Sequence, residues 1–218
     1  MKMKRLVQSA SIVGVAIFML AATAGAATVT FNTNLAATGF NGTNNNTLNS
    51  SFGVAATLVF QDNGTIVTGV PSNVNYGDFL LTCPLCTTQA IGTGSATFAA
   101  FSFNLEINDL TDGATGIFVG TSTGGEIFSD VSPISIIWSP AVLGPGTNNA
   151  ASGNFGPTFF QIIPISLIVA PNSGTPPGAT TVNGIVTSTD VPEPATLVLM
   201  GGALLGLGLL RRKGFSRQ

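Results

Sequence analysis

The chain has 218 residues, a size typical of one domain with accessory segments, and its seven Lys or Arg and nine Asp or Glu residues give a net charge of -2. All of the basic residues lie at positions 2–5 or 211–217, and no Lys, Arg or His occurs from residue 6 to residue 210. The part of the chain between these ends, called the body, has no Lys or Arg to neutralise phosphates, which excludes nucleic-acid binding. The absence of His and of internal Lys excludes Ser-His-Asp sites, histidine-ligated zinc and pyridoxal Schiff bases.

The first 26 residues have the layout of a secretory signal peptide. A basic start at Lys2, Lys4 and Arg5 precedes an apolar run centred on Ile12–Leu20. Small residues follow, and they fit an A-x-A cleavage site that ends at Ala26 or, as the second choice, at Ala24. The run is short for a membrane span, which disfavours the alternative of an uncleaved anchor helix. The sequence therefore predicts export of the rest of the chain.

Residues 191–218 have three parts. The motif Pro192-Glu193-Pro194 precedes Ala195–Leu210, an unbroken run of small and apolar residues, and Arg211, Arg212 and Lys213 close the run. As a helix this run would measure about 24 Å, somewhat less than a hydrocarbon core of about 30 Å. By the positive-inside rule the basic cluster stays in the cytoplasm while the body lies outside. We expect a C-terminal transmembrane helix.

The three-part tail resembles the PEP-CTERM sorting signal, a module also catalogued as the ice-binding protein C-terminal domain. The resemblance rests on Pro192, Glu193 and Pro194, on the apolar run and on the basic cluster Arg211, Arg212 and Lys213. It implies an exosortase, a membrane protease-transferase of Gram-negative bacteria that make exopolysaccharide, as the processing partner. The precursor would stay in the inner membrane until cleavage near the motif leaves the body periplasmic, on the cell surface or outside the cell. The alternative is a plain C-terminal membrane anchor.

Residues 27–190 predict an all-β domain. From Phe101 to Asn108 apolar and polar residues alternate, which is the period of a half-buried strand. With turn signals between the segments, the pattern favours an antiparallel β-sandwich of jelly-roll or immunoglobulin-like type. The Asn- and Gly-rich segment 39–51 predicts a loop or an edge without periodicity, and Pro164 predicts an edge strand or a bulge within 159–169. The other strand candidates are 28–31, 54–60, 65–70, 79–82, 117–120, 134–138, 159–169 and 181–187.

Cys83 and Cys86 form a C-x-x-C pair in an exported protein. A thioredoxin-like redox motif needs a following helix that lowers the thiol pKa, and nothing near these cysteines predicts a helix. Haem attachment would need His at position 87, which is Thr. A local disulfide in an oxidising compartment is the preferred interpretation.

Asp109 and Asp112, with Asn108, are weak candidates for a calcium site because Ca²⁺ prefers oxygen ligands. The spacing is not that of a calcium-binding loop, and Asp and Asn also favour turns for their own hydrogen bonds. A structural turn is therefore the preferred interpretation, with calcium-assisted stability as a hypothesis. No other cofactor is expected.

Glu106 and Glu126 are the remaining candidates for paired catalytic carboxylates of a glycosidase. Glu106 falls on the polar face of the alternating strand, and one Trp and one Tyr offer little aromatic surface for sugar. The N-x-S/T triplets at Asn41, Asn45, Asn49 and Asn63 are explained by composition. We therefore expect a non-enzymatic surface or extracellular-matrix protein, with a carbohydrate- or calcium-binding, adhesin-like module as the alternative.

Overall fold

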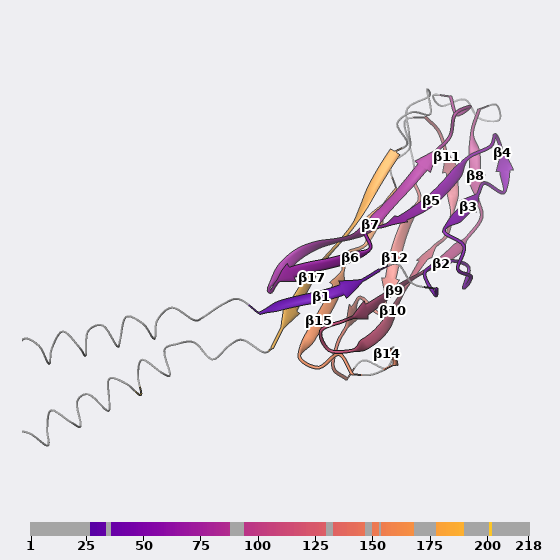
Figure 1. The fold of residues 1–218 in the computed structure, drawn as a ribbon. Helices are drawn as coiled ribbons and strands as arrows, with labels where there is room; N and C mark the ends of the chain where they lie inside the picture. The colour runs from indigo at the N-terminus through magenta and orange to yellow at the C-terminus, as the bar shows by residue number, and fades with distance from the viewer. Residues whose placement is uncertain are drawn as a thin grey trace, which may run out of the picture. The chain divides into compact units, whose positions relative to one another are not determined.

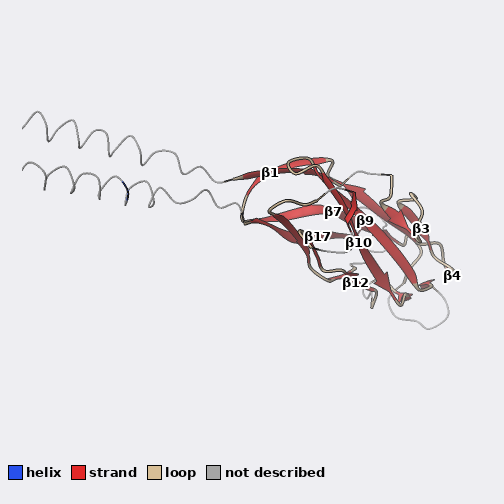
Figure 2. Ribbon diagram, turned by 90° about the horizontal axis from the view of Figure 1, so that it is seen from below, coloured by secondary structure: helices blue, strands red, loops and turns tan. Residues whose placement is uncertain are grey.

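A computed structural model describes residues 27–33, 36–87, 94–129, 133–146, 150–152, 154–167, 178–189 and 201. Thr28–Thr189, here called the body, form one compact unit made of antiparallel strands joined by turns and loops (Figures 1 and 2). The prediction of an antiparallel all-β body is confirmed. The expected signal peptide and C-terminal helix lie outside the described residues, apart from Gly201. Among the described residues, no helix is long and apolar enough to cross a membrane.

The largest sheet has eight strands in the order β16-β12-β10-β9-β1-β6, with β14 paired to β10 and β2 paired to β9. Its centre is the hairpin of β9 and β10, in which nine residue pairs from Ala114↔Asp109 to Ser122↔Phe101 are in register. The alternation predicted from Phe101 to Asn108 is confirmed, because the odd positions of β9 are buried. The strands are β1 (Thr28–Asn32), β2 (Gly39–Phe40), β6 (Thr65–Gly69), β9 (Phe101–Asp109), β10 (Ala114–Ser122), β12 (Ser135–Ser139), β14 (Ala150–Ser152) and β16 (Ile165–Ser166).

A second large sheet has six strands in the order β13-β15-β17-β7-β5-β3. Its long central pair joins β7 and β17, with a register shift between Thr181 and Asn183. The expected strand 79–82 is only the end of β7, because Asn and Gly residues hide the alternation of its first half. The strands are β3 (Thr47–Asn49), β5 (Thr57–Asp62), β7 (Ser72–Thr82), β13 (Val142–Leu143), β15 (Thr158–Ile162) and β17 (Gly178–Ser188).

The prediction that segment 39–51 is a loop or an edge is confirmed in part. The segment contains loop and β3, an edge strand that pairs with β5, and it also contains β2, which pairs with β9. One expectation about a chain segment was wrong. The expected strand 159–169 is two strands, and Pro164 lies at the step between them. The amide of Ile163 still donates to Asn183 of β17 (3.0 Å), whereas that of Leu167 donates to Ile134, next to β12 (2.9 Å). Pro164, which has no N–H to donate, therefore occupies the point where the chain changes sheets.

Aromatic rings from the two large sheets pack against one another and form the core. Phe103 of β9 lies at the centre, with ring centroids 4.8 Å from Phe60 and 4.9 Å from Phe79 on the opposite sheet. The rings of Phe40 and Trp138, from its own sheet, lie 4.9 and 6.3 Å away. These tilted and edge-on arrangements are the ones that aromatic quadrupoles favour. The aromatic contacts therefore hold the two sheets face to face.

Replacing Phe103 with Ala should lower the free energy of unfolding by about 3–5 kcal/mol, because the ring is fully buried and the cavity would lie between the sheets. Urea unfolding of the full chain in detergent, followed by tryptophan fluorescence, measures the change. Phe103→Leu is the milder variant if Phe103→Ala does not fold. Val67→Ala on β6, where the side chain is 67% exposed, should change stability by no more than about 0.5 kcal/mol. Equal effects of the Phe103 and Val67 variants would contradict this assignment of the core.

Candidate functional site

A small three-stranded sheet lies toward the end of the body opposite the start of β1 (Figure 1). It consists of β4 (Phe52–Gly53), β8 (Ala96–Phe98) and β11 (Gly125–Ile127) in the order β11-β8-β4. Phe52 and Glu126 both pair with Thr97, so these three side chains form one row across the sheet. Phe52 and Glu126 are exposed and Thr97 is half-buried, whereas the alternate positions of β8 are buried. We call this row the solvent row.

Backbone contacts on both sides of Phe52 fix β4 on β8. The amide of Ser51 donates to the Thr97 carbonyl (2.7 Å), and the amide of Val54 donates to the Ser95 carbonyl (2.8 Å). Gly53 adopts a φ of +82°, and a Cβ at this position would collide with the Ser95 carbonyl oxygen. Only glycine combines this dihedral with so close an approach at little cost. The site of the Phe52 ring is therefore set by the backbone.

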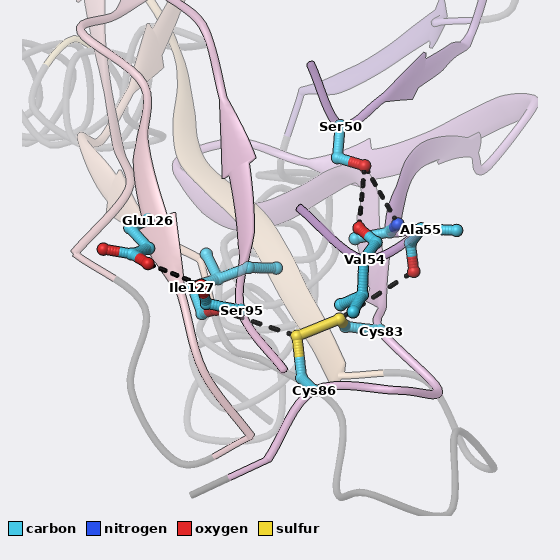
Figure 3. Close-up of a disulfide and its surroundings, with 9 residues drawn as sticks. Ser50, Val54, Ala55, Cys83, Cys86, Ser95, Glu126 and Ile127 are labelled. Atoms are coloured by element: carbon cyan, nitrogen blue, oxygen red, sulfur yellow. Dashed lines mark hydrogen bonds between the residues drawn. A yellow bond between two sulfur atoms is a disulfide. The ribbon is translucent and has the colours of Figure 1, made fainter. Parts of the chain in front are cut away.

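Cys83 and Cys86 form a disulfide, the pairing that their C-x-x-C spacing predicts. Both sulfurs are buried beneath the small sheet (Figure 3). Cys83 Sγ lies 3.9 Å from the carbonyl oxygen of Ala55, which follows β4, and Cys86 Sγ lies 3.7 Å from that of Ile127 at the end of β11. Because disulfide sulfurs carry no hydrogen, these are packing contacts. The disulfide thus supports both outer strands of the small sheet.

Ser95 orients the carboxylate of Glu126. Its hydroxyl donates to Glu126 Oε1 at 2.5 Å, a short distance typical of a charge-assisted hydrogen bond (Figure 3). Ser95 itself is buried, and its backbone carbonyl is the acceptor that holds Val54. Glu126 Oε2 has no hydrogen-bond partner among the described residues. Within the described part of the chain, the carboxylate is therefore held at one oxygen only.

Glu106 lies on a different sheet from Glu126 and has other partners. It belongs to β9, and its Oε2 accepts a hydrogen bond from the amide of Ala37 (3.0 Å). The structure thus assigns each of the two glutamates a local role in holding neighbouring chain. The sequence-based hypothesis of a glycosidase pair gains no support from this arrangement.

Asp109 ends the buried row of β9 and points its carboxyl group into the turn before β10. Its Oδ1 accepts hydrogen bonds from the amides of Thr111 (2.9 Å) and Asp112 (3.2 Å), and its backbone carbonyl accepts from Gly113 (2.8 Å). The Oδ2 atoms of Asp109 and Asp112 are both buried without a hydrogen-bond partner. The pKa of Asp109 is raised to about 6, because burial and the neighbouring Asp112 carboxyl raise it by more than the two amide hydrogen bonds lower it. One proton held between the carboxyl groups would supply the missing donor.

The structure brings Asp109 and Asp112 together, as the calcium hypothesis requires, but it gives Asn108 another role. The Asn108 side-chain oxygen accepts from the hydroxyl of Thr115 across the hairpin (3.4 Å). No group of three or more His, Cys, Asp or Glu side chains that could hold a metal ion occurs in the described part of the chain. Calcium binding therefore stays a prediction, and the turn interpretation accounts for the hydrogen bonds that are present.

Sequence reasoning missed Phe52, Thr97 and Ser95. Phe52 and Ser95 lie 43 positions apart in the chain, so no local spacing joins them. A weak signal did exist, since Phe52 is a large apolar residue between Ser51 and Gly53, directly after the Asn-rich segment. The predicted residues Ala24, Ala26, Pro192, Glu193, Pro194, Arg211, Arg212 and Lys213 lie outside the described residues.

Replacing Asp109 with Asn should stabilise the protein near neutral pH and flatten its pH profile. The folded-state pKa of about 6 lies above the ordinary value of 3.8. The stability that this proton contributes is therefore fully present below about pH 4 and is lost as the pH rises through about 6. Asparagine keeps the Oδ1 acceptor and can donate to Asp112 Oδ2, a hydrogen bond worth about 1.5–3 kcal/mol when one partner is charged. Urea unfolding of the full chain in detergent from about pH 4 to about pH 7 measures the difference.

The control for this prediction is Asp62→Asn, which keeps the side-chain oxygen that accepts from Gly64. Its pH profile should match that of the unaltered chain. Parallel profiles for the unaltered chain and Asp109→Asn would contradict the shared proton. Repeating the series with calcium and with a chelator tests the calcium hypothesis, because a stabilisation by calcium that Asp109→Asn abolishes would favour a cation between the carboxylates.

Comparison with known protein families identifies the tail. Residues 190–213 match the PEP-CTERM protein-sorting motif. The match includes Pro192-Glu193-Pro194, the apolar run and the Arg211–Lys213 cluster, and it confirms the resemblance inferred from the sequence. Comparison with curated proteins and with solved structures gave no match to this chain. The chain therefore carries a PEP-CTERM protein-sorting motif, the signal for exosortase-dependent sorting of an exported protein at the membrane.

Proposed function

We propose that this protein is a non-enzymatic component of the cell surface or extracellular matrix, delivered by export and by exosortase processing of its tail. The PEP-CTERM motif at residues 190–213 is the observation that carries the proposal. A signal of this kind serves proteins that act outside the inner membrane, so the body would work in the periplasm, on the surface or beyond it. Exopolysaccharide is the partner that such a location favours.

The physical properties of both ends support the proposed route. The basic residues Lys2, Lys4 and Arg5 and the apolar segment after them suit a signal peptide cleaved after Ala26. The run Ala195–Leu210 is long enough for a short membrane helix, and the cluster after it would stop transfer. The precursor would be held in the inner membrane by this helix until the exosortase acts near the motif.

The structure of the body supports an exported β-sandwich. Two antiparallel sheets enclose an aromatic core, with ring contacts such as Phe31–Phe160 (5.2 Å) and Phe40–Phe79 (6.1 Å) between them. We propose a sandwich of jelly-roll or immunoglobulin-like type on this basis. The Cys83–Cys86 disulfide suits an oxidising compartment outside the cytoplasm.

A strain with an active exosortase should remove the tail of the unaltered protein, and Glu193→Ala should block that removal. Mass spectrometry of the protein from membrane and extracellular fractions measures the C-terminal mass. The mature form should lack Arg211, Arg212 and Lys213, whereas Glu193→Ala should keep them and stay in the membrane fraction. Asp62→Asn removes a carboxylate from the body and should be processed normally. An intact tail on the unaltered protein in the exosortase-positive strain would refute the proposed sorting.

A further inference from the structure

We propose that the solvent row of the small sheet binds a neutral polysaccharide, with Phe52 as the stacking surface and Thr97 and Glu126 as hydrogen-bonding groups. This inference rests on the proposed surface or matrix role and adds a ligand to it. The solvent row lies on the small sheet at one end of the body, and the disulfide supports this sheet (Figure 1).

The exposure of Phe52 is the first argument. Its side chain is 80% exposed, whereas Tyr76 is 0% and Trp138 is 4% exposed. Tyr76 and Trp138 are thus part of the core and offer no surface for a sugar. Exposing a large apolar ring to water is unfavourable in free energy, and a ligand that covers the ring removes this unfavourable exposure. The C–H face of a sugar ring suits this partner because its weakly positive hydrogens meet the negative face of the aromatic ring.

The spacing of the solvent row is the second argument. Adjacent strands lie about 4.8 Å apart, so Phe52 and Glu126 are separated by about 10 Å with Thr97 between them. An extended polysaccharide could cross the strands and contact all three side chains. A carboxylate accepts hydrogen bonds from sugar hydroxyls, and the threonine hydroxyl both donates and accepts. Apolar stacking beside a few polar groups that fix orientation is the usual composition of a small-molecule site.

Rigidity is the third argument. Ser95 holds Glu126 Oε1 in place, which leaves Oε2 for a ligand. The hydrogen bonds of Ser51 and Val54 fix the backbone on either side of Phe52, and the disulfide packs against the carbonyls that follow β4 and end β11. Figure 3 shows the disulfide between Ala55 and Ile127, and Ser95 beside Glu126. A site fixed before binding loses little conformational entropy when the ligand arrives.

Charge decides between neutral and acidic polysaccharides. No Lys, Arg or His occurs from residue 6 to residue 210, and the solvent row itself contains the carboxylate of Glu126. A polyanionic chain would meet repulsion without any compensating cation from the body. A neutral chain meets no such repulsion and can still donate hydroxyl hydrogens to Glu126.

Affinity gel electrophoresis of the full chain in non-ionic detergent tests the inference. The gels contain dextran, a galactomannan or a mixed-linkage β-glucan as neutral probes, with alginate as the acidic comparison. At least one neutral polymer should retard the unaltered chain, and alginate should not. Phe52→Ala should weaken binding about tenfold, in the range expected for losing a central aromatic anchor. Val67→Ala removes an equally accessible apolar side chain from β6 and should bind normally.

Two further variants separate stacking from general apolar contact and hydrogen bonding. Phe52→Leu keeps an apolar side chain without a ring and should bind nearly as weakly as Phe52→Ala. Glu126→Gln keeps the acceptor for Ser95 but loses the charge, and it should weaken binding several-fold with an unchanged melting temperature. Because Phe52 is exposed, its variants should have the same melting temperature as the unaltered protein.

Three results would overturn the inference: no retardation by any of the neutral polymers, undiminished binding by Phe52→Ala, or retardation by alginate. Mass spectrometry of the same preparations from the exosortase-positive strain shows whether the tail has been removed. This measurement separates the test of the binding site from the test of sorting. A protein that loses its tail but binds no neutral polymer refutes the site alone. A protein that binds through Phe52 but keeps its tail refutes the sorting proposal alone.

Discussion

The body has no positively charged side chain with which to neutralise its carboxylates, and this constraint shapes its polar structure. Within the body, carboxylates can then accept hydrogen bonds only from neutral donors. Asp62 accepts from the amide of Gly64, Glu106 from that of Ala37, and Glu126 from the hydroxyl of Ser95. Each of these bonds also fixes a turn or holds one segment of chain against another. The carboxylates therefore act as local hydrogen-bond acceptors that order loops.

At the β9–β10 turn, neutral donors do not satisfy every carboxylate oxygen of Asp109 and Asp112. Asp109 uses Oδ1 to hold the turn, but its Oδ2 and that of Asp112 are buried without donors. In many domains a lysine or arginine would donate hydrogen bonds to such oxygens, but this body has neither residue. A proton is the one donor that the pair can supply for itself, and burial together with the neighbouring Asp112 carboxyl raises the pKa of Asp109. The turn thus couples the main hairpin to pH.

The sequence predicted the parts of the fold that depend on local pattern. The alternation from Phe101 to Ile107 identified β9 because side chains on one sheet face repeat every second residue. Short strands such as β4 and β8 have no such pattern of their own, and they form because distant segments pair with them. The solvent row could not be predicted, since Phe52, Thr97 and Glu126 meet only through strand register. The disulfide could be predicted because its two cysteines are neighbours in the chain.

Charge segregation links the sorting of the protein to what its body can bind. The basic residues all lie in the two terminal segments, so the proposed processing at both ends would remove them and leave only acids. The net charge of -2 would then belong to the precursor alone, and the processed body would be strongly acidic. A surface of that kind is repelled by polyanions, so direct contacts with a matrix would depend on aromatic stacking and on hydrogen bonds to neutral chains. An exposed ring beside a hydroxyl, as on the solvent row, is a means of attachment that this charge distribution permits.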